Sequence, residues 1–153
     1  MPNWSKGSLR IRGKGADIVK FITEGICNSQ NYIENKDTYF SFYTEKDNPL
    51  YINKSDRCFV EHAYVYIEQS DMENTKSVAL ASCASAWNWE LKDIMEICNT
   101  YHIDVAITAY EQGQEFRQDI MVVYNNGTPK VLKNHYTEFD DYNWECESPC
   151  LGG

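Results

Sequence analysis

The chain has 153 residues, a length that suits a single domain with its own hydrophobic core. It carries 23 Asp and Glu residues against 14 Lys and Arg residues, and its formal net charge is −9. This charge disfavours generic binding to phosphate backbones and favours a basic partner. No stretch approaches the ~18 consecutive apolar residues of a membrane helix, and the first residues lack the apolar run of a signal peptide, so we expect a cytoplasmic protein.

The first third of the chain predicts a strand, a helix and a β-rich segment. Apolar and polar residues alternate over 8–12, which is typical of a half-buried strand. Over 16–26, apolar residues recur with helical spacing. Residues 28–56 are polar and irregular around a run of β-forming residues at 38–44, and we expect an inserted strand or hairpin there.

The rest of the chain alternates between strand patterns and one further helix. Residues 91–101 have apolar residues at helical spacing, and Asn88 is placed to cap the first turn of this helix. Asn125, Asn126 and Gly127 tolerate the positive φ of a tight hairpin turn. The segments with strand character are 57–68, 77–83, 103–110, 120–124 and 131–132.

The order of these elements contains the β-α-β-β-α-β succession of the ferredoxin-like arrangement. We therefore expect an α+β ferredoxin-like sandwich, with two helices on one face of an antiparallel sheet and an inserted or extra β-hairpin. The expected domain covers residues 1–137, with the β-rich insertion near 28–56, and an acidic aromatic tail follows at 138–153. The second face of such a sheet, or its edge, is available for binding.

Two short patterns suggest a relationship to a known group of proteins. Met-Pro-Asn-Trp at residues 1–4, followed by a short strand and Gly13, resembles the start of the YubB-like ferredoxin-fold family of phages and plasmids, although Ser5 stands where its members tend to have Cys. Trp87 before the second helix, and a strand ending at Glu111 with a glycine two residues later, are similar to the family's second half. The resemblance implies an accessory protein of a mobile element, acting in the cytoplasm of a bacterial host cell. From there we expect an inhibitor of a host defence complex of CRISPR or restriction type.

The acidic aromatic tail is the first candidate binding site. It interleaves carboxylates, which steer a charged partner, with large aromatic residues of the type enriched in interface hot spots. Docking of these aromatic residues on the domain itself is the alternative. We expect the partner to be a host protein with a basic surface, such as a nucleic-acid-binding defence complex that an acidic DNA mimic would occupy. The candidate residues are Glu138, Asp140, Asp141, Tyr142, Trp144, Glu145 and Glu147.

A second candidate is a nucleotide or single-stranded nucleic-acid site on the open face of the sheet. Four basic residues and no acidic residue lie among the first 14 positions. Together with nearby tyrosines, they would form a surface like the stacking sheets of RNA-binding domains. A solvated strand face, or ion pairs with the acidic tail, is the alternative. These residues are Lys6, Arg10, Arg12 and Lys14.

No pattern in the chain predicts a catalytic or metal site, and we expect neither an enzyme nor a cofactor. Cys146 and Cys150 lack the second pair of ligands that a zinc site needs. In a regular strand, Cys58 and His62 would share one face, but this spacing alone does not make a nucleophile and its base.

The remaining cysteines and two tryptophans indicate core packing. Trp87 and Trp89 flank the start of the second helix, and we expect both to pack rather than to bind a ligand. A free thiol in apolar surroundings behaves as a small hydrophobic group. We expect this role for Cys27, Cys58, Cys83 and Cys98.

Overall fold

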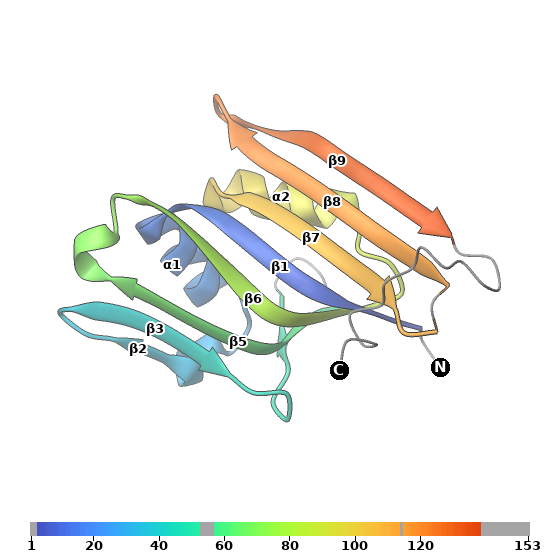
Figure 1. Cartoon of the computed structure of the whole chain (residues 1–153). Coiled ribbons are helices and arrows are strands. Elements are labelled where there is room, and N and C mark those ends of the chain that lie inside the picture. Colours follow the sequence, from blue (N-terminus) through green and yellow to red (C-terminus); the bar gives the residue numbers. More distant parts are fainter. Residues whose placement is uncertain (1–2, 53–56, 114, 139–153) are drawn as a thin grey trace.

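The computed structural model describes residues 3–52, 57–113 and 115–138. These residues form an antiparallel sheet with two α-helices, so the predicted α+β class is confirmed (Figure 1). The helices are α1 (Gly15–Gly25) and α2 (Leu91–Tyr101), and short 3₁₀ turns lie at Ser29–Tyr32 and Gln69–Asp71. The strands are β1 (Trp4–Lys14), β2 (Ile33–Asn35), β3 (Tyr39–Thr44), β4 (Leu50–Tyr51), β5 (Cys58–Glu68), β6 (Thr75–Ala86), β7 (Asp104–Glu111), β8 (Phe116–Asn125) and β9 (Thr128–Glu138).

The strands lie in the order β2-β3-β5-β6-β1-β7-β8-β9. The short strand β4 also pairs with β5, at Phe59 and Val60, whereas β3 pairs with its residues 63–68. All neighbouring strands are antiparallel. The first strand of the chain, β1, therefore lies in the interior of the sheet, between β6 and β7. The short strands β2 and β3 extend one side of the sheet, and the β8–β9 hairpin extends the other (Figure 1).

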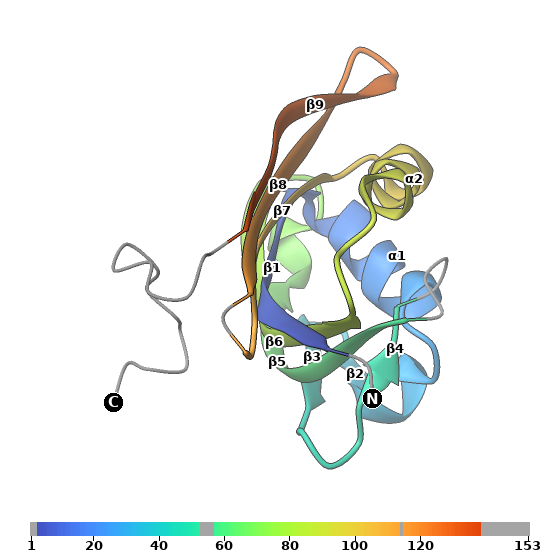
Figure 2. The ribbon, with the colours of Figure 1, turned by 90° about the vertical axis from the view of Figure 1, so that its right-hand side faces the viewer.

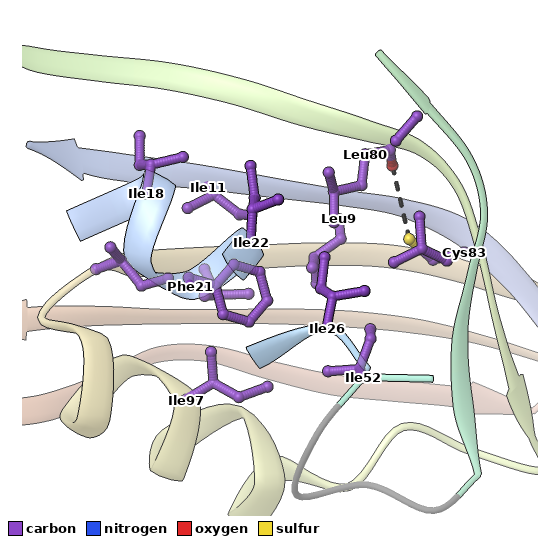
Figure 3. Packing of buried hydrophobic residues seen from close by; sticks show 14 of the residues in the cluster. Leu9, Ile11, Ile18, Phe21, Ile22, Ile26, Ile52, Leu80, Cys83 and Ile97 are labelled. Carbon is purple, nitrogen blue, oxygen red and sulfur yellow. Dashed lines mark hydrogen bonds between the residues drawn. The ribbon is translucent and has the colours of Figure 1, made fainter. Parts of the chain in front are cut away.

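Both helices pack on the same face of the sheet (Figure 2). α1 buries Ile18, Phe21 and Ile22, which meet Leu9 and Ile11 from β1 in the core (Figure 3). α2 adds its own apolar side, including Ile97, to the same cluster. Among the described residues, no helix covers the opposite face of the sheet, because the apolar sides of both helices pack on this one.

The helices agree with the sequence-based prediction to within one residue at each end. The predicted cap of α2 is wrong, because Glu90 occupies the N-cap position and makes no side-chain capping bond. The carbonyl of Asn88 instead accepts a hydrogen bond from the Ser85 hydroxyl at 3.1 Å. The strands β1, β6, β8 and β9 are longer than predicted, and β1 begins at Trp4 rather than at residue 8.

Candidate binding surface

The face of the sheet that the helices leave uncovered carries exposed tyrosines on β3 and β5. Side chains alternate along both strands, so that Phe42 and Val65 belong to the core while their neighbours point away from it. Tyr43 is 45% exposed, Tyr64 is 64% exposed and Tyr66 is 47% exposed. We use the name tyrosine face for Tyr39, Tyr43, His62, Tyr64 and Tyr66.

Neighbouring rings of the tyrosine face contact one another across the two strands. Tyr39 stacks on Tyr66, with 5.3 Å between ring centroids and 24° between ring planes. Tyr43 makes edge-to-face contacts with Tyr64 and His62, at centroid distances of 6.5 and 6.1 Å. The register accounts for one of these contacts, since Tyr43 lies directly opposite Tyr64. The rings therefore form two contacting groups on the same face, Tyr39 with Tyr66 and Tyr43 with Tyr64 and His62. These contacts lower the side-chain entropy left to lose on binding.

Carboxylates at the rim make the tyrosine face acidic. The Tyr39 hydroxyl donates to Glu34 at 2.8 Å, and the Tyr43 hydroxyl donates to Glu45. These hydrogen bonds, together with burial and the nearby negative charge, raise the pKa of both phenols above the usual value. Between positions 33 and 68, the described residues include six Asp and Glu against three Lys and Arg.

A second aromatic group continues this surface toward the other end of β5. The Phe59 ring lies 4.4 Å from the Tyr51 ring and 5.6 Å from the Trp4 ring, measured between centroids. Trp4 and Phe59 line a pocket of about 250 Å³ together with Lys6 and Glu61. Those two side chains form an ion pair at 2.9 Å and are largely buried. The positive charge of Lys6 and the negative charge of Glu61 in this pocket thus neutralise each other.

The four basic residues of the predicted nucleic-acid site lie along β1, at alternate positions that face away from the core. Three of these basic residues form ion pairs with carboxylates of the described domain, and not with the tail. Arg10 occupies an exposed position in the same row. The ion pairs are Lys6 with Glu61 at 2.9 Å, Arg12 with Asp104 at 2.7 Å and Lys14 with Glu73 at 3.5 Å.

Strand β6 separates these basic residues from the tyrosine face. Its Ser77, Ala79 and Ala84 lie opposite Arg12, Arg10 and Lys6 in the register with β1, so the outer surface of β6 is made of small side chains. With strands ~4.8 Å apart, β1 and β5 lie about 10 Å from each other. Arg10 and Arg12 therefore share a face with the tyrosines but are separated from them by β6, whereas Lys6 reaches across β6 to Glu61 on β5.

Only one residue of the predicted tail site belongs to the described chain. Glu138 is exposed at the end of β9. The other candidates lie outside the described residues: Asp140, Asp141, Tyr142, Trp144, Glu145 and Glu147.

Cys58 and His62 do not share a face, contrary to the expectation for a regular strand. The pairing of β5 with β6 shifts between Val60 and His62. This bulge inserts one extra residue, so the His62 side chain points outward while Cys58 stays in the core. The two side chains therefore cannot act as a nucleophile and its base.

Two residues that we expected in the core are exposed. Cys27 follows α1 and lies at the surface, and Trp87 is 49% exposed. The expectation is confirmed for Trp89, Cys58, Cys83 and Cys98, which are buried. Burial raises the pKa of the Cys98 thiol to about 12, so the thiol stays protonated at neutral pH.

Within residues 3–52, 57–113 and 115–138, no three His, Cys, Asp or Glu side chains come together as metal ligands. None of the helices in this part of the chain is long and apolar enough to cross a membrane.

No protein-family model matches this chain, and comparison with curated proteins and with solved structures finds no similar protein. The tyrosine face is therefore identified from the arrangement of its side chains and not from a related protein. In the sequence, its signal is the placement of tyrosines between core residues, as in Tyr64-Val65-Tyr66. Polar residues usually occupy the solvent-facing positions of such a strand. Aromatic residues at these positions therefore indicate an exposed sheet face that can bind a partner.

Proposed function

We propose that this protein is a non-enzymatic binding protein whose tyrosine face docks on a basic surface of a partner protein. The observation that carries the proposal is the set of partly exposed rings, in contact within two groups, on the sheet face opposite the two described helices. Tyrosine is enriched in interface hot spots, because a rigid ring removes a large area from water at a small entropic cost. An exposed cluster of this kind contributes little to the core.

The charge around the tyrosine face selects the kind of partner. Glu34 and Glu45 hold tyrosine hydroxyls at its rim, and Glu68 lies opposite Tyr39 in the strand register. Lysine and arginine side chains bind aromatic rings through cation–π contacts and bind carboxylates as ion pairs. Phosphate backbones are repelled by the same carboxylates. The surface therefore fits a basic protein better than a nucleic acid.

The ferredoxin-like assignment is part of this proposal. The elements β1, α1, β5, β6, α2 and β7 follow the β-α-β-β-α-β succession. Their strands lie in the order β5-β6-β1-β7, with both helices on one face. This order supports the assignment, in which β2, β3 and β4 belong to the insertion and β8–β9 adds to the sheet.

The resemblance to YubB-like proteins extends the proposal to a mobile-element protein that inhibits a host defence complex of CRISPR or restriction type. Such a complex binds nucleic acid and therefore carries a basic surface. An acidic aromatic surface can occupy it in place of the nucleic acid. The carboxylates of the tail, from Glu138 onward, would add to the net negative charge of the chain.

Quantitative affinity capture from a bacterial host lysate tests the proposal, followed by titration of the purified partner. The Tyr64→Ser/Tyr66→Ser variant removes two exposed rings, so the fold should persist while partner binding weakens at least tenfold. Leu132→Ser is the matched control, because Leu132 is 54% exposed on the distant strand β9. Replacement of basic residues on the partner by glutamate should weaken binding to the parent in the same way.

Two results would overturn this function. One is that the parent retains no protein partner, and the other is that the tyrosine variant and its control retain the partner equally. Salt-dependent oligonucleotide binding that Arg10→Gln/Arg12→Gln abolishes would instead favour the nucleic-acid alternative.

A further inference from the structure

A separate aromatic pocket lies where β8 and β9 meet the segment before α2. It has a volume of about 400 Å³ and is lined by Trp87, Asn88, Phe116 and Tyr136. Phe116 stacks on Tyr136, with 4.9 Å between ring centroids and 26° between ring planes. Trp87 and Tyr136 are each 49% exposed. The pocket is thus large enough for a small organic ligand, for which typical sites measure about 300–1,000 Å³.

Hydrogen bonds hold the segment that carries Trp87 in place on the helix side of the sheet (Figure 2). The backbone N–H of Trp87 donates to the carbonyl of Asn3 at 2.8 Å. The buried side-chain amide of Gln118 accepts from the N–H of Trp89 and donates to its carbonyl, both at 2.8 Å. The indole of Trp87 is therefore presented by a backbone that is fixed before any ligand arrives, which favours binding.

Trp87 also has a backbone conformation that its residue type disfavours. Its φ is +69°, in the left-handed region, whereas the other described residues with positive φ are Asn, His or Gly. A bulky residue with such a φ is strained, and strained residues cluster at ligand-binding sites. The indole is half exposed and is not among the residues of the core cluster, so core packing does not account for this conformation. Binding offers a reason for it.

Carboxylates lie near Tyr136 and Phe116, although none of them lines the pocket itself. Burial and the negative charges of Glu138, Glu115 and Glu111 raise the pKa of Tyr136. Glu138 lies opposite Phe116 in the strand register, and Glu115 precedes Phe116 in the chain. Aromatic faces and nearby carboxylates both attract positive charge.

We propose that Trp87, Phe116 and Tyr136 form a binding site for an alkylammonium group, with Glu115 and Glu138 as counter-charges. The site is distinct from the tyrosine face in its residues and in the side of the sheet on which it lies. A free quaternary ammonium compound and the side chain of a lysine both present this chemistry.

Nuclear magnetic resonance titration of the ¹⁵N-labelled chain tests the site directly. Choline is the probe, and 3,3-dimethyl-1-butanol is its neutral counterpart of the same shape. Choline should shift the indole N–H signal of Trp87 in a saturable way, and the neutral alcohol should bind about tenfold more weakly. Titration with Nα-acetyl-lysine methylamide then distinguishes a protein side chain from a free small molecule as the source.

Trp87→Gly is the decisive variant, because it removes the indole and also relieves the positive φ. The variant should remain folded and bind choline about tenfold more weakly. The indole signal that is missing from its spectrum assigns the signal of Trp87. Glu115→Gln should weaken choline binding severalfold, while Glu73→Gln, a substitution of an exposed residue that pairs with Lys14 elsewhere, should not change it.

Three results would overturn the proposal. They are the absence of saturable shifts with choline and with the lysine derivative, equal binding of choline and the neutral alcohol, and unchanged choline binding by Trp87→Gly. Loss of the protein partner in the tyrosine variants would bear on the tyrosine face alone, so the two proposals fail independently.

Discussion

The two faces of the sheet use aromatic residues in different ways. On the covered face, Phe21 and Phe42 are completely buried among aliphatic side chains. On the uncovered face, Tyr64 and Tyr66 contact other rings but remain about half exposed or more. Removal of apolar area from water is the main source of folding stability. The covered face therefore stabilises the fold, and the uncovered face keeps apolar area available for a partner.

Like the exposed tyrosines, the ion pairs lie outside the core. The described ion pairs, such as Arg12 with Asp104 and Arg117 with Asp119, lie on the uncovered face or in loops. Exposed pairs of this kind contribute little to stability. Their arrangement instead shapes the potential that a partner meets.

The largest expected effect separates the two faces directly. Phe21→Ala should lower the free energy of unfolding by about 3–5 kcal/mol, because it leaves a cavity in the core. Tyr64→Ala should lower it by less than about 0.5 kcal/mol, because the ring is already in water. Urea denaturation of both variants measures the difference. A loss of several kcal/mol for Tyr64→Ala would make the tyrosine face a structural feature.

An intermediate effect concerns Asp119 on the uncovered side of β8. Burial opposes ionisation of this carboxyl, but hydrogen bonds from Arg117 at 2.8 Å and Thr108 at 3.0 Å hold its pKa below the usual value. A lowered pKa adds stability above the unfolded-state value of about 3.9, and this stability disappears as the pH falls through the folded-state pKa. Asp119→Asn should therefore cost about 1 kcal/mol at pH 7.

The cost of Asp119→Asn should vanish at the acidic end of the range, since both forms are then neutral. Urea denaturation of parent and variant between about pH 2 and pH 7 tests the sign. A cost that is the same at every pH would show that the hydrogen bonds, and not the charge, account for the loss.

The smallest expected effect concerns the ion pair between Arg12 on β1 and Asp104 on β7. Arg12 and Asp104 are 2.7 Å apart, but the Arg12 side chain is 60% exposed. A double-mutant cycle with Arg12→Gln and Asp104→Asn should give a coupling energy of about 0.2–1 kcal/mol that decreases with salt. A coupling energy well above this range would mean that the pair is part of the folded core and is not available to a ligand.

Local patterns account for what could be predicted. The periodicity of apolar residues defined α1 and α2 to within one residue, and the Asn-Asn-Gly turn of the β8–β9 hairpin lies where predicted. These features depend on residues close in the chain, so the sequence contains the information for them.

Features that depend on distant segments were not predictable in this way. The bulge in β5 sends His62 and Cys58 to opposite faces, and it arises only where β5 pairs with β6. The placement of Trp87 depends on the hydrogen bond from its backbone N–H to the Asn3 carbonyl and on the two hydrogen bonds between Gln118 and Trp89. Neither partner is near Trp87 in the chain.

The amino-acid sequence by itself determined the α+β class, the two helices and the acidic, aromatic character of the molecule. The tertiary structure alone decided which aromatic residues meet. Pairing of β3 with β5 assembled the tyrosine face, and the order of the sheet placed it apart from the basic strand β1. The physical reason is that helix periodicity is a local property, whereas a binding surface on a sheet requires the register of strands that are distant in the chain.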